Sequence, residues 1–273
     1  MDNIEDSNLE NTVTEAQEEE FNHSDKMIGI FTEPGKTFER ISKFPLKIVD
    51  WLLPAILLFT VISITQILIN SNNALHSQIV DKQISKIQKN LQQAVSEGKL
   101  TQEQADQQIN MIEERMTNYG PLQIIITIFA VFIGGFIVFF LISGVYYLFV
   151  KFLLKGNGTY QSVLVANGMT FYIAILGVII TTITSFALGN FLDSTSLASF
   201  LGSDKSSIVG FIFSKLDVFS IWSYIVLSIG LAKLFKSDST AKYYFTIFGI
   251  WILGGIVFFL LAKAIPFLQF FGA

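Results

Sequence analysis

Few side chains in this sequence could carry out chemistry, and they lie far apart. The chain has no cysteine, and its histidines, His23 and His76, stand alone in polar segments without neighbours at the spacing of a zinc site. Asp217 lies where a polar connection meets an apolar segment that includes Trp222. A carboxylate there can cap a helix, which we favour, or bind a ligand or partner. No nucleophile–base pair or carboxylate dyad is visible, so we predict no enzyme activity and no cofactor or metal.

A second group of polar candidates lies inside an apolar segment. Four small residues recur there at intervals of four, which places them on one helix face. They are Gly177, Thr181, Ser185 and Gly189. In lipid, small residues let helices approach closely, so we favour a packing role. The alternative is a polar-lined path for a solute that also uses Asn167.

The composition indicates that the helices carrying these residues lie in a membrane. Hydrophobic residues make up 51% of the 273 residues, and charged residues only 15%. Five apolar segments approach the roughly 20 residues that a membrane-crossing helix needs. They are 51–70, 122–150, 163–188, 218–232 and 244–262. These segments hold essentially no ionisable group, which argues against proton-coupled transport. The fourth is short, so a four-span protein is the alternative.

The N-terminal region divides into two predicted parts. Residues 1–25 contain nine acidic and no basic side chains, and we predict a disordered acidic tail that is no signal peptide. Residues 26–50 contain a short helical pattern that starts near Pro34 and places Phe38, Ile41 and Phe44 on one side. This pattern predicts an amphipathic segment at the membrane interface.

A polar insert, residues 71–120, separates the first two spans. Gly98 ends one amphipathic helical pattern, and Thr101 with Gln104 forms a capping-box signature for the next. We therefore predict an extramembrane helical hairpin. Its two apolar stripes either bury each other, which we favour, or recognise a partner. Between the third and fourth spans, residues 189–216 hold apolar runs too short to cross a bilayer, which we expect at the interface or dipping into the bundle.

Lysine and arginine residues are about twice as dense in the loops that share a side with the N-terminus. This bias predicts a cytoplasmic N-terminus and an external C-terminus. No basic footprint for nucleic acid is present, so the lipid bilayer is the expected surrounding.

Three stretches of the sequence, taken together, carry a family resemblance. They are residues 30–41, ahead of Pro45 and the first span; Gly158-Thr159-Tyr160, ahead of the third; and 216–222, which continues to Leu231. They resemble the Yip family of Ypt/Rab-interacting membrane proteins, especially its bacterial members. The resemblance covers about 27–262, except for the hairpin, which resembles an insertion. It implies a five-helix membrane domain with a cytosolic N-terminus. Eukaryotic members are associated with Rab GTPases, vesicle traffic and membrane shaping.

These observations predict an all-α integral membrane protein, a five-transmembrane-helix bundle formed by residues 51–70 and 121–263. We expect a non-enzymatic scaffold or adaptor in a bacterial cytoplasmic membrane, which binds protein partners through its tail and hairpin and forms homo-oligomers. The alternative is a small-solute channel or permease. The residues expected to serve interaction or packing are Pro34, Phe38, Asp217, Trp222, Gly177, Thr181, Ser185 and Gly189.

Overall fold

The computed structural model describes residues 21–117 and 120–264, and these residues fold almost entirely as helices. Only one isolated bridge, between Ser196 and Asp217, joins extended backbone within the described ranges. The helices are α1 (His23–Thr32), α2 (Pro34–Ile41), α3 (Val49–Ser71), α4 (Asn73–Ser96), α5 (Gln102–Thr117), α6 (Pro121–Leu148), the π-helical turn η1 (Phe149–Leu153), α7 (Tyr160–Leu188), α8 (Leu197–Phe200), α9 (Ile208–Lys215), α10 (Val218–Leu234) and α11 (Ala241–Ala264).

Four helical segments are long and apolar enough to cross a membrane: α3, α6 with η1, α7 and α11. A fifth crossing results if α9 and α10, which are bent by 58° at a short break, form one span. The prediction of an all-α membrane protein is confirmed, with four or five spans. The predicted weak fourth span is this bent pair. With 17 residues, α10 is about 26 Å long, less than the ~30 Å of a bilayer core.

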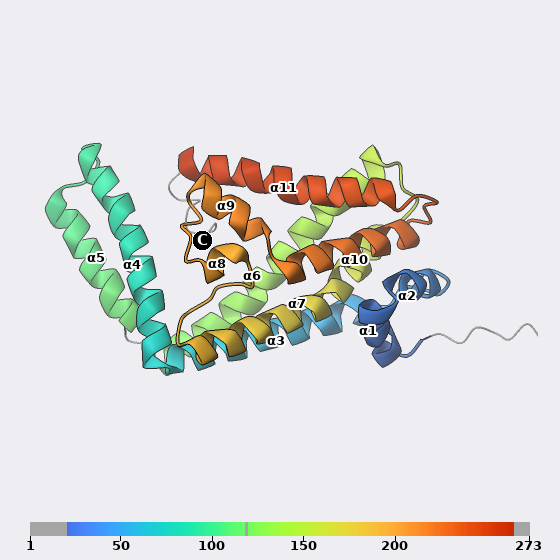
Figure 1. Cartoon of the computed structure of the whole chain (residues 1–273), viewed down its shortest axis with the longest axis horizontal. Coiled ribbons are helices and arrows are strands. Elements are labelled where there is room, and N and C mark those ends of the chain that lie inside the picture. Colours follow the sequence, from blue (N-terminus) through green and yellow to red (C-terminus); the bar gives the residue numbers. More distant parts are fainter. Residues whose placement is uncertain (1–20, 118–119, 265–273) are drawn as a thin grey trace, which may run out of the picture.

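Helix α7 lies at the centre of the bundle and packs against both α3 and α10 (Figure 1). Glycines make both approaches close. A Cβ atom on Gly168 would lie 2.6 Å from the Cα of Trp51 in α3, and one on Gly177 would lie 3.1 Å from the side chain of Phe219 in α10. Helices in lipid gain their attraction from such close packing. Small residues on two sides of α7 therefore allow it to pack closely between α3 and α10.

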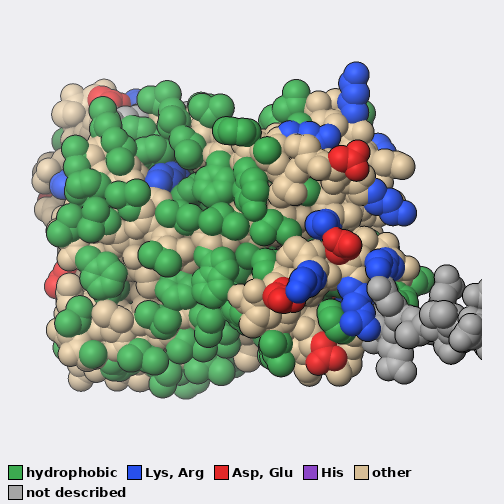
Figure 2. Space-filling model, turned by 45° about the vertical axis from the view of Figure 1, so that its right-hand side comes forward, with side chains coloured by type: hydrophobic (Ala, Val, Ile, Leu, Met, Phe, Trp, Pro, Cys, Tyr) green, Lys and Arg blue, Asp and Glu red, His purple; other side chains and the backbone are tan. Residues whose placement is uncertain are grey.

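Helices α6 and α11 expose most of their apolar side chains. Figure 2 shows the result, a broad apolar surface beside a region at one end where the charged side chains gather. An apolar surface of this extent is typical of a protein surrounded by lipid.

The polar insert forms two helices, α4 and α5, that pack against each other and project from one end of the bundle (Figure 1). Gly98 adopts a left-handed φ of 69° between them. The predicted capping box is present: the backbone N–H of Gln104 donates to Oγ1 of Thr101, and the backbone N–H of Thr101 donates to Oε1 of Gln104. Ala105 is buried in the hairpin. Recognition of a partner by this hairpin stays a prediction.

The N-terminal segments differ from the prediction in two respects. Helix α1 starts at His23, inside the predicted disordered tail, because the side chain of Asn22 accepts a hydrogen bond from the backbone N–H of Asp25 and caps the helix. The rest of the tail, residues 1–20, lies outside the described residues. Second, the apolar face of α1 and α2 is covered by protein: Ile30, Phe38 and Ile41 belong to the buried core. The amphipathic pattern thus reflects packing onto the bundle, and placement at a lipid interface stays a prediction.

Candidate functional site

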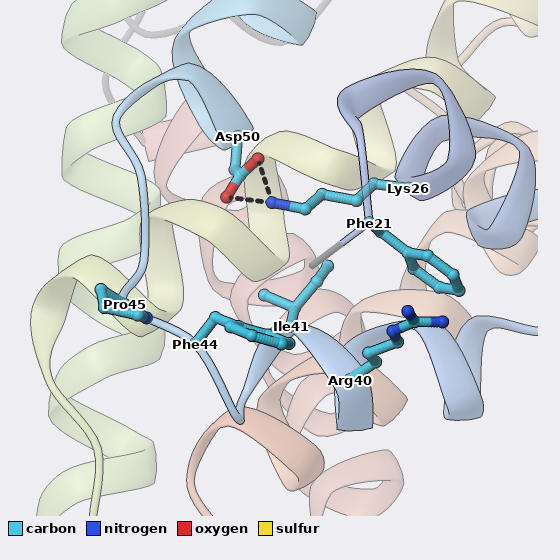
Figure 3. A pocket seen from close by; sticks show the side chains of 7 residues that line it. All are labelled: Phe21, Lys26, Arg40, Ile41, Phe44, Pro45 and Asp50. Atoms are coloured by element: carbon cyan, nitrogen blue, oxygen red, sulfur yellow. Dashed lines mark hydrogen bonds and ion pairs between the residues drawn. The ribbon is translucent and has the colours of Figure 1, made fainter. Parts of the chain in front are cut away.

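The candidate site is the N-terminal platform, by which we mean α1 and α2 together, and its attachment to the bundle. Its centre is a buried ion pair (Figure 3). The Nζ atom of Lys26 in α1 lies 3.0 Å and 3.1 Å from the two carboxylate oxygens of Asp50, which belongs to the first turn of α3. The side chains are only 5% and 1% exposed. Each charge therefore depends on the other, because water cannot replace the lost partner.

Two further side chains extend this pair into a small polar cluster. The Nδ1 atom of His23 lies 3.4 Å from Oδ1 of Asp50, and its Nε2 atom lies 2.6 Å from the hydroxyl of Tyr172 in α7. The cluster therefore joins α1 to both α3 and α7, although His23 and Tyr172 are 149 positions apart in the sequence.

The sequence pattern does not reveal this cluster. The predicted first span begins at Trp51 and holds no charged residue, whereas α3 begins at Val49 and includes Asp50. A usable signal was present: Lys26 precedes the core residue Ile30 by four positions, so both lie on the apolar face of α1. A lysine on a buried helix face almost always has a specific partner. The sequence does not show which of the many carboxylates that partner is.

Three of the predicted site residues belong to the platform and its contact with α10. Pro34 occupies the first turn of α2, where a backbone N–H is not needed. The ring of Phe38 lies against Gly230, where an added Cβ atom would be 2.8 Å from the ring. Trp222 makes an edge-on contact with Phe31 of α1, with 5.8 Å between the ring centroids. The structure therefore places Phe38 and Trp222 at the interface between platform and bundle.

An ion pair adds to this contact at the surface. The Nζ atom of Lys233, near the end of α10, lies 2.6 Å from Oε2 of Glu39 in α2. The hydrogen bond and the charge of Lys233 lower the pKa of the Glu39 carboxyl. Because both side chains are substantially exposed, this pair contributes little to stability.

A groove with a volume of about 510 Å³ lies between α1 and α2. It is lined by Phe21, Asp25, Ile28, Gly29, Thr32, Glu33, Lys36, Thr37, Glu39, Arg40 and Lys43. At its edge the guanidinium of Arg40 lies over the ring of Phe21, 3.8 Å from the centroid. The platform therefore offers a concave, strongly charged surface at the end of the bundle.

Asp217 caps α10, as its position predicts. Its Oδ1 atom accepts a hydrogen bond of 2.7 Å from the backbone N–H of Ser220, and its Oδ2 atom accepts one of 2.6 Å from the hydroxyl of Thr195. Asp217 is buried, and both carboxylate oxygens bond within the protein. It lies at the opposite end of α10 from Lys233, so the structure does not bring it together with the platform.

The small-residue stripe of α7 forms hydrogen bonds and packing contacts. The hydroxyl of Thr181 donates to the carbonyl of Gly177, and that of Ser185 donates to Thr181 and accepts from the backbone N–H of Leu192. Gly189 ends the helix with a left-handed φ of 61°. Earlier in α7, the side-chain amide of Asn167 donates to the hydroxyl of Ser143 in α6. These contacts support the packing interpretation of the stripe.

A second polar cluster attaches α4 to the connection after α7. The side-chain amide of Gln78 donates to the carbonyl of Gly189 and accepts from the backbone N–H of Phe191. Close by, Asp193 pairs with Lys205 at 2.7 Å and with Lys82 of α4 at 3.5 Å. Burial raises the pKa of Asp193, but hydrogen bonds from Lys205 and Ser199 and the charges of Lys205 and Lys82 outweigh it and lower the pKa to about 2.

Neither histidine belongs to a candidate metal site. Across residues 21–117 and 120–264, no three His, Asp or Glu side chains gather closely enough to hold a metal ion. His23 contacts Asp50 and Tyr172, and His76 lies 2.8 Å from the side-chain oxygen of Asn70.

Comparison with known proteins shows the family to which this helical bundle belongs. The family model described as the Yip1 domain matches residues 28–262. Membrane protein YknW of Bacillus subtilis (strain 168) is 32% identical over 103 residues, which are 37% of this chain and 43% of that protein. The match thus spans less than half of the curated relative. No solved structure matches the chain. Because the family model extends over nearly all of the helical bundle, the chain belongs to the Yip1 domain family of membrane proteins, as the resemblance in its sequence indicates.

Proposed function

We propose that this Yip1-family protein is a non-enzymatic scaffold or adaptor, which binds protein partners through the N-terminal platform and the α4–α5 hairpin. One observation carries the proposal: a charged platform is fixed to an apolar bundle by the buried pair of Lys26 and Asp50. Such a pair adds little net stability compared with apolar side chains of similar size. Its contribution here is a defined position of α1 and α2 against α3.

The interior of the bundle supports the same proposal. Thr181, Ser185 and Asn167 form hydrogen bonds with their own or neighbouring helices. These groups are used for packing, whereas the platform and the hairpin present polar side chains outward. The rival proposal, a channel or permease for a small solute, would require the α7 stripe to line a path.

We further propose that the platform lies on the cytoplasmic side of a bacterial cell membrane and that the C-terminus lies outside. Three segments meet at the platform end: α2, the end of α10 through Lys233, and the α6–α7 connection, whose Gly156 and Gly158 contact Phe235. Figure 2 shows charged side chains gathered at this end. Basic residues near the spans are retained on the cytoplasmic side, which supports the assignment.

The proposal is tested by purification from native membranes in mild detergent, followed by mass spectrometry. We expect a protein partner that the wild type retains and that is lost with Asp50→Asn, which leaves Lys26 buried without this partner. Asp238→Asn, the same substitution at an exposed side chain in the α10–α11 connection, is the matched control and should retain it. If no partner is specific, and if purified protein in liposomes moves a solute in a way that Thr181→Phe abolishes, the channel proposal replaces this one.

A further inference from the structure

We propose that the groove between α1 and α2 is the binding site of the chain's own acidic segment, residues 1–20, which covers the platform until a partner displaces it. This inference rests on the proposed function and deepens it, because the chain's own N-terminal segment would then control access of partners to the platform. It rests on the shape of the groove, the charges of its walls and the order of the residues along the chain.

The groove suits an acidic peptide because its α2 wall has an excess of positive charge. Lys36, Arg40 and Lys43 line this wall, and Lys233 of α10 reaches it through Glu39. The carboxylates on α2 have defined partners, since Glu33 pairs with Lys36 at 3.0 Å and Glu39 with Lys233 at 2.6 Å. The lining of the groove therefore holds three bases and three acids, one of the acids being Asp25 on α1. Lys233 of α10, next to the lining, makes the local balance four bases to three acids.

The candidate occupant has the complementary charge. Residues 1–20 contain no lysine or arginine and eight carboxylates: Asp2, Glu5, Asp6, Glu10, Glu15, Glu18, Glu19 and Glu20. Carboxylates pair with lysine and bind arginine in bidentate geometry. Three of these acids, residues 18–20, directly precede Phe21 in the sequence.

The connection point lies in the groove itself. Phe21 lines the groove, and its ring lies under the guanidinium of Arg40 at 3.8 Å. The acidic segment is thus covalently joined to a residue of its proposed site. An attached segment has an effective local concentration on the order of millimolar, so even weak contacts suffice for binding. A separate acidic protein or an anionic lipid headgroup would have to compete with it.

The absence of cysteine from the chain allows a direct test. Thr32 lines the groove, is exposed and donates its hydroxyl to the carbonyl of Ile28 one turn earlier. A Thr32→Cys variant of the full chain, purified into nanodiscs of neutral lipid, is labelled with a maleimide. Ser96→Cys is the matched control, because Ser96 is also exposed, helical and bonded to a backbone carbonyl, but lies on the hairpin.

We expect labelling of Thr32→Cys to become about fivefold faster when the eight carboxylates of residues 1–20 are changed to amides, because the segment no longer occupies the groove. High salt should accelerate labelling of the acidic chain similarly, since ions screen exposed charges. Changing Lys36 and Lys43 to Gln should have the same effect from the groove side. Labelling of Ser96→Cys should not change.

Equal labelling rates for the acidic and amide chains would overturn the proposal. Protection that requires anionic lipid in the nanodisc but not the carboxylates would overturn it as well, and would assign the groove to a headgroup. The measurement needs no partner protein. If the protein proves to have no scaffold function, the labelling result is unaffected. If the labelling experiment fails, the scaffold proposal is likewise unaffected.

Discussion

At the scale of single residues, the buried pair of Lys26 and Asp50 should dominate the attachment of the platform. Asp50→Asn leaves the Lys26 ammonium buried without its carboxylate, which typically costs about 3–5 kcal/mol. We expect a marked loss of thermal stability in detergent and faster proteolysis within α1. The double variant Lys26→Met/Asp50→Leu should recover most of the stability, because it removes both charges together. Equal losses in single and double variants would contradict the role of the pair.

The cap of α10 gives a second prediction at this scale. Asp217→Ala removes the acceptor for the Ser220 N–H and leaves the Thr195 hydroxyl without its partner. Loss of a cap costs about 0.5–2 kcal/mol of folding free energy. Asp217→Asn keeps one acceptor oxygen and should cost less. Thermal unfolding of the three proteins in one detergent checks this order, and a larger loss for Asn than for Ala would contradict it.

At the scale of elements, the contact between α2 and α10 depends on the absence of a side chain at Gly230. Gly230→Ala places a Cβ atom 2.8 Å from the buried ring of Phe38, so the ring or α2 must move, at a cost of about 1–3 kcal/mol. Gly134→Ala in α6 is the matched control, because no atom lies within 4 Å of its added Cβ. Protease accessibility of α2 should rise only in the Gly230 variant. A similar change in both variants would contradict the contact.

The connection between α4 and α7 should respond to acid. The pKa of Asp193 is lowered to about 2, so the stability from its contacts is complete above the carboxyl's ordinary pKa near 4 and is lost as pH falls from about 4 towards 2. The stability difference between wild type and Asp193→Asn should be constant above pH 5 and shrink below pH 4. Chemical denaturation across this pH range measures it. A difference independent of pH would contradict the role of the carboxylate.

Most of the helices can be predicted from the sequence, and the features that cannot be predicted have physical causes. Hydropathy, Gly98 and the Thr101–Gln104 signature predict the apolar helices and the hairpin, because these are local properties. The cap at Asp217 follows for the same reason. The buried cluster does not, because the partner of Lys26 is chosen by the packing of α1 against α3. The stretches that carry the resemblance include Phe38 and Trp222. The sequence does not show that these two side chains belong to one interface, Phe38 on its platform side and Trp222 on its bundle side.

At the scale of the whole molecule, the bent pair of α9 and α10 decides the topology. If it crosses the membrane, the α8–α9 and α10–α11 connections lie on opposite sides. In the cysteine-free chain, an impermeant maleimide should label Ser206→Cys in intact cells and label Ser239→Cys only after lysis. Labelling of both positions in intact cells, or of neither, would favour four spans.

The central claim is that the protein acts through its platform and hairpin by binding partners. Photo-crosslinking in native membranes tests it most directly, with a photoreactive residue in place of Lys36 on α2, Gln107 on α5 or, as a control, the highly exposed Phe245 on α11. We predict discrete protein adducts at Lys36 or Gln107 that are absent at Phe245, with the Lys36 adducts lost in Asp50→Asn. The same diffuse pattern at all three positions, unaffected by Asp50→Asn, would contradict the account.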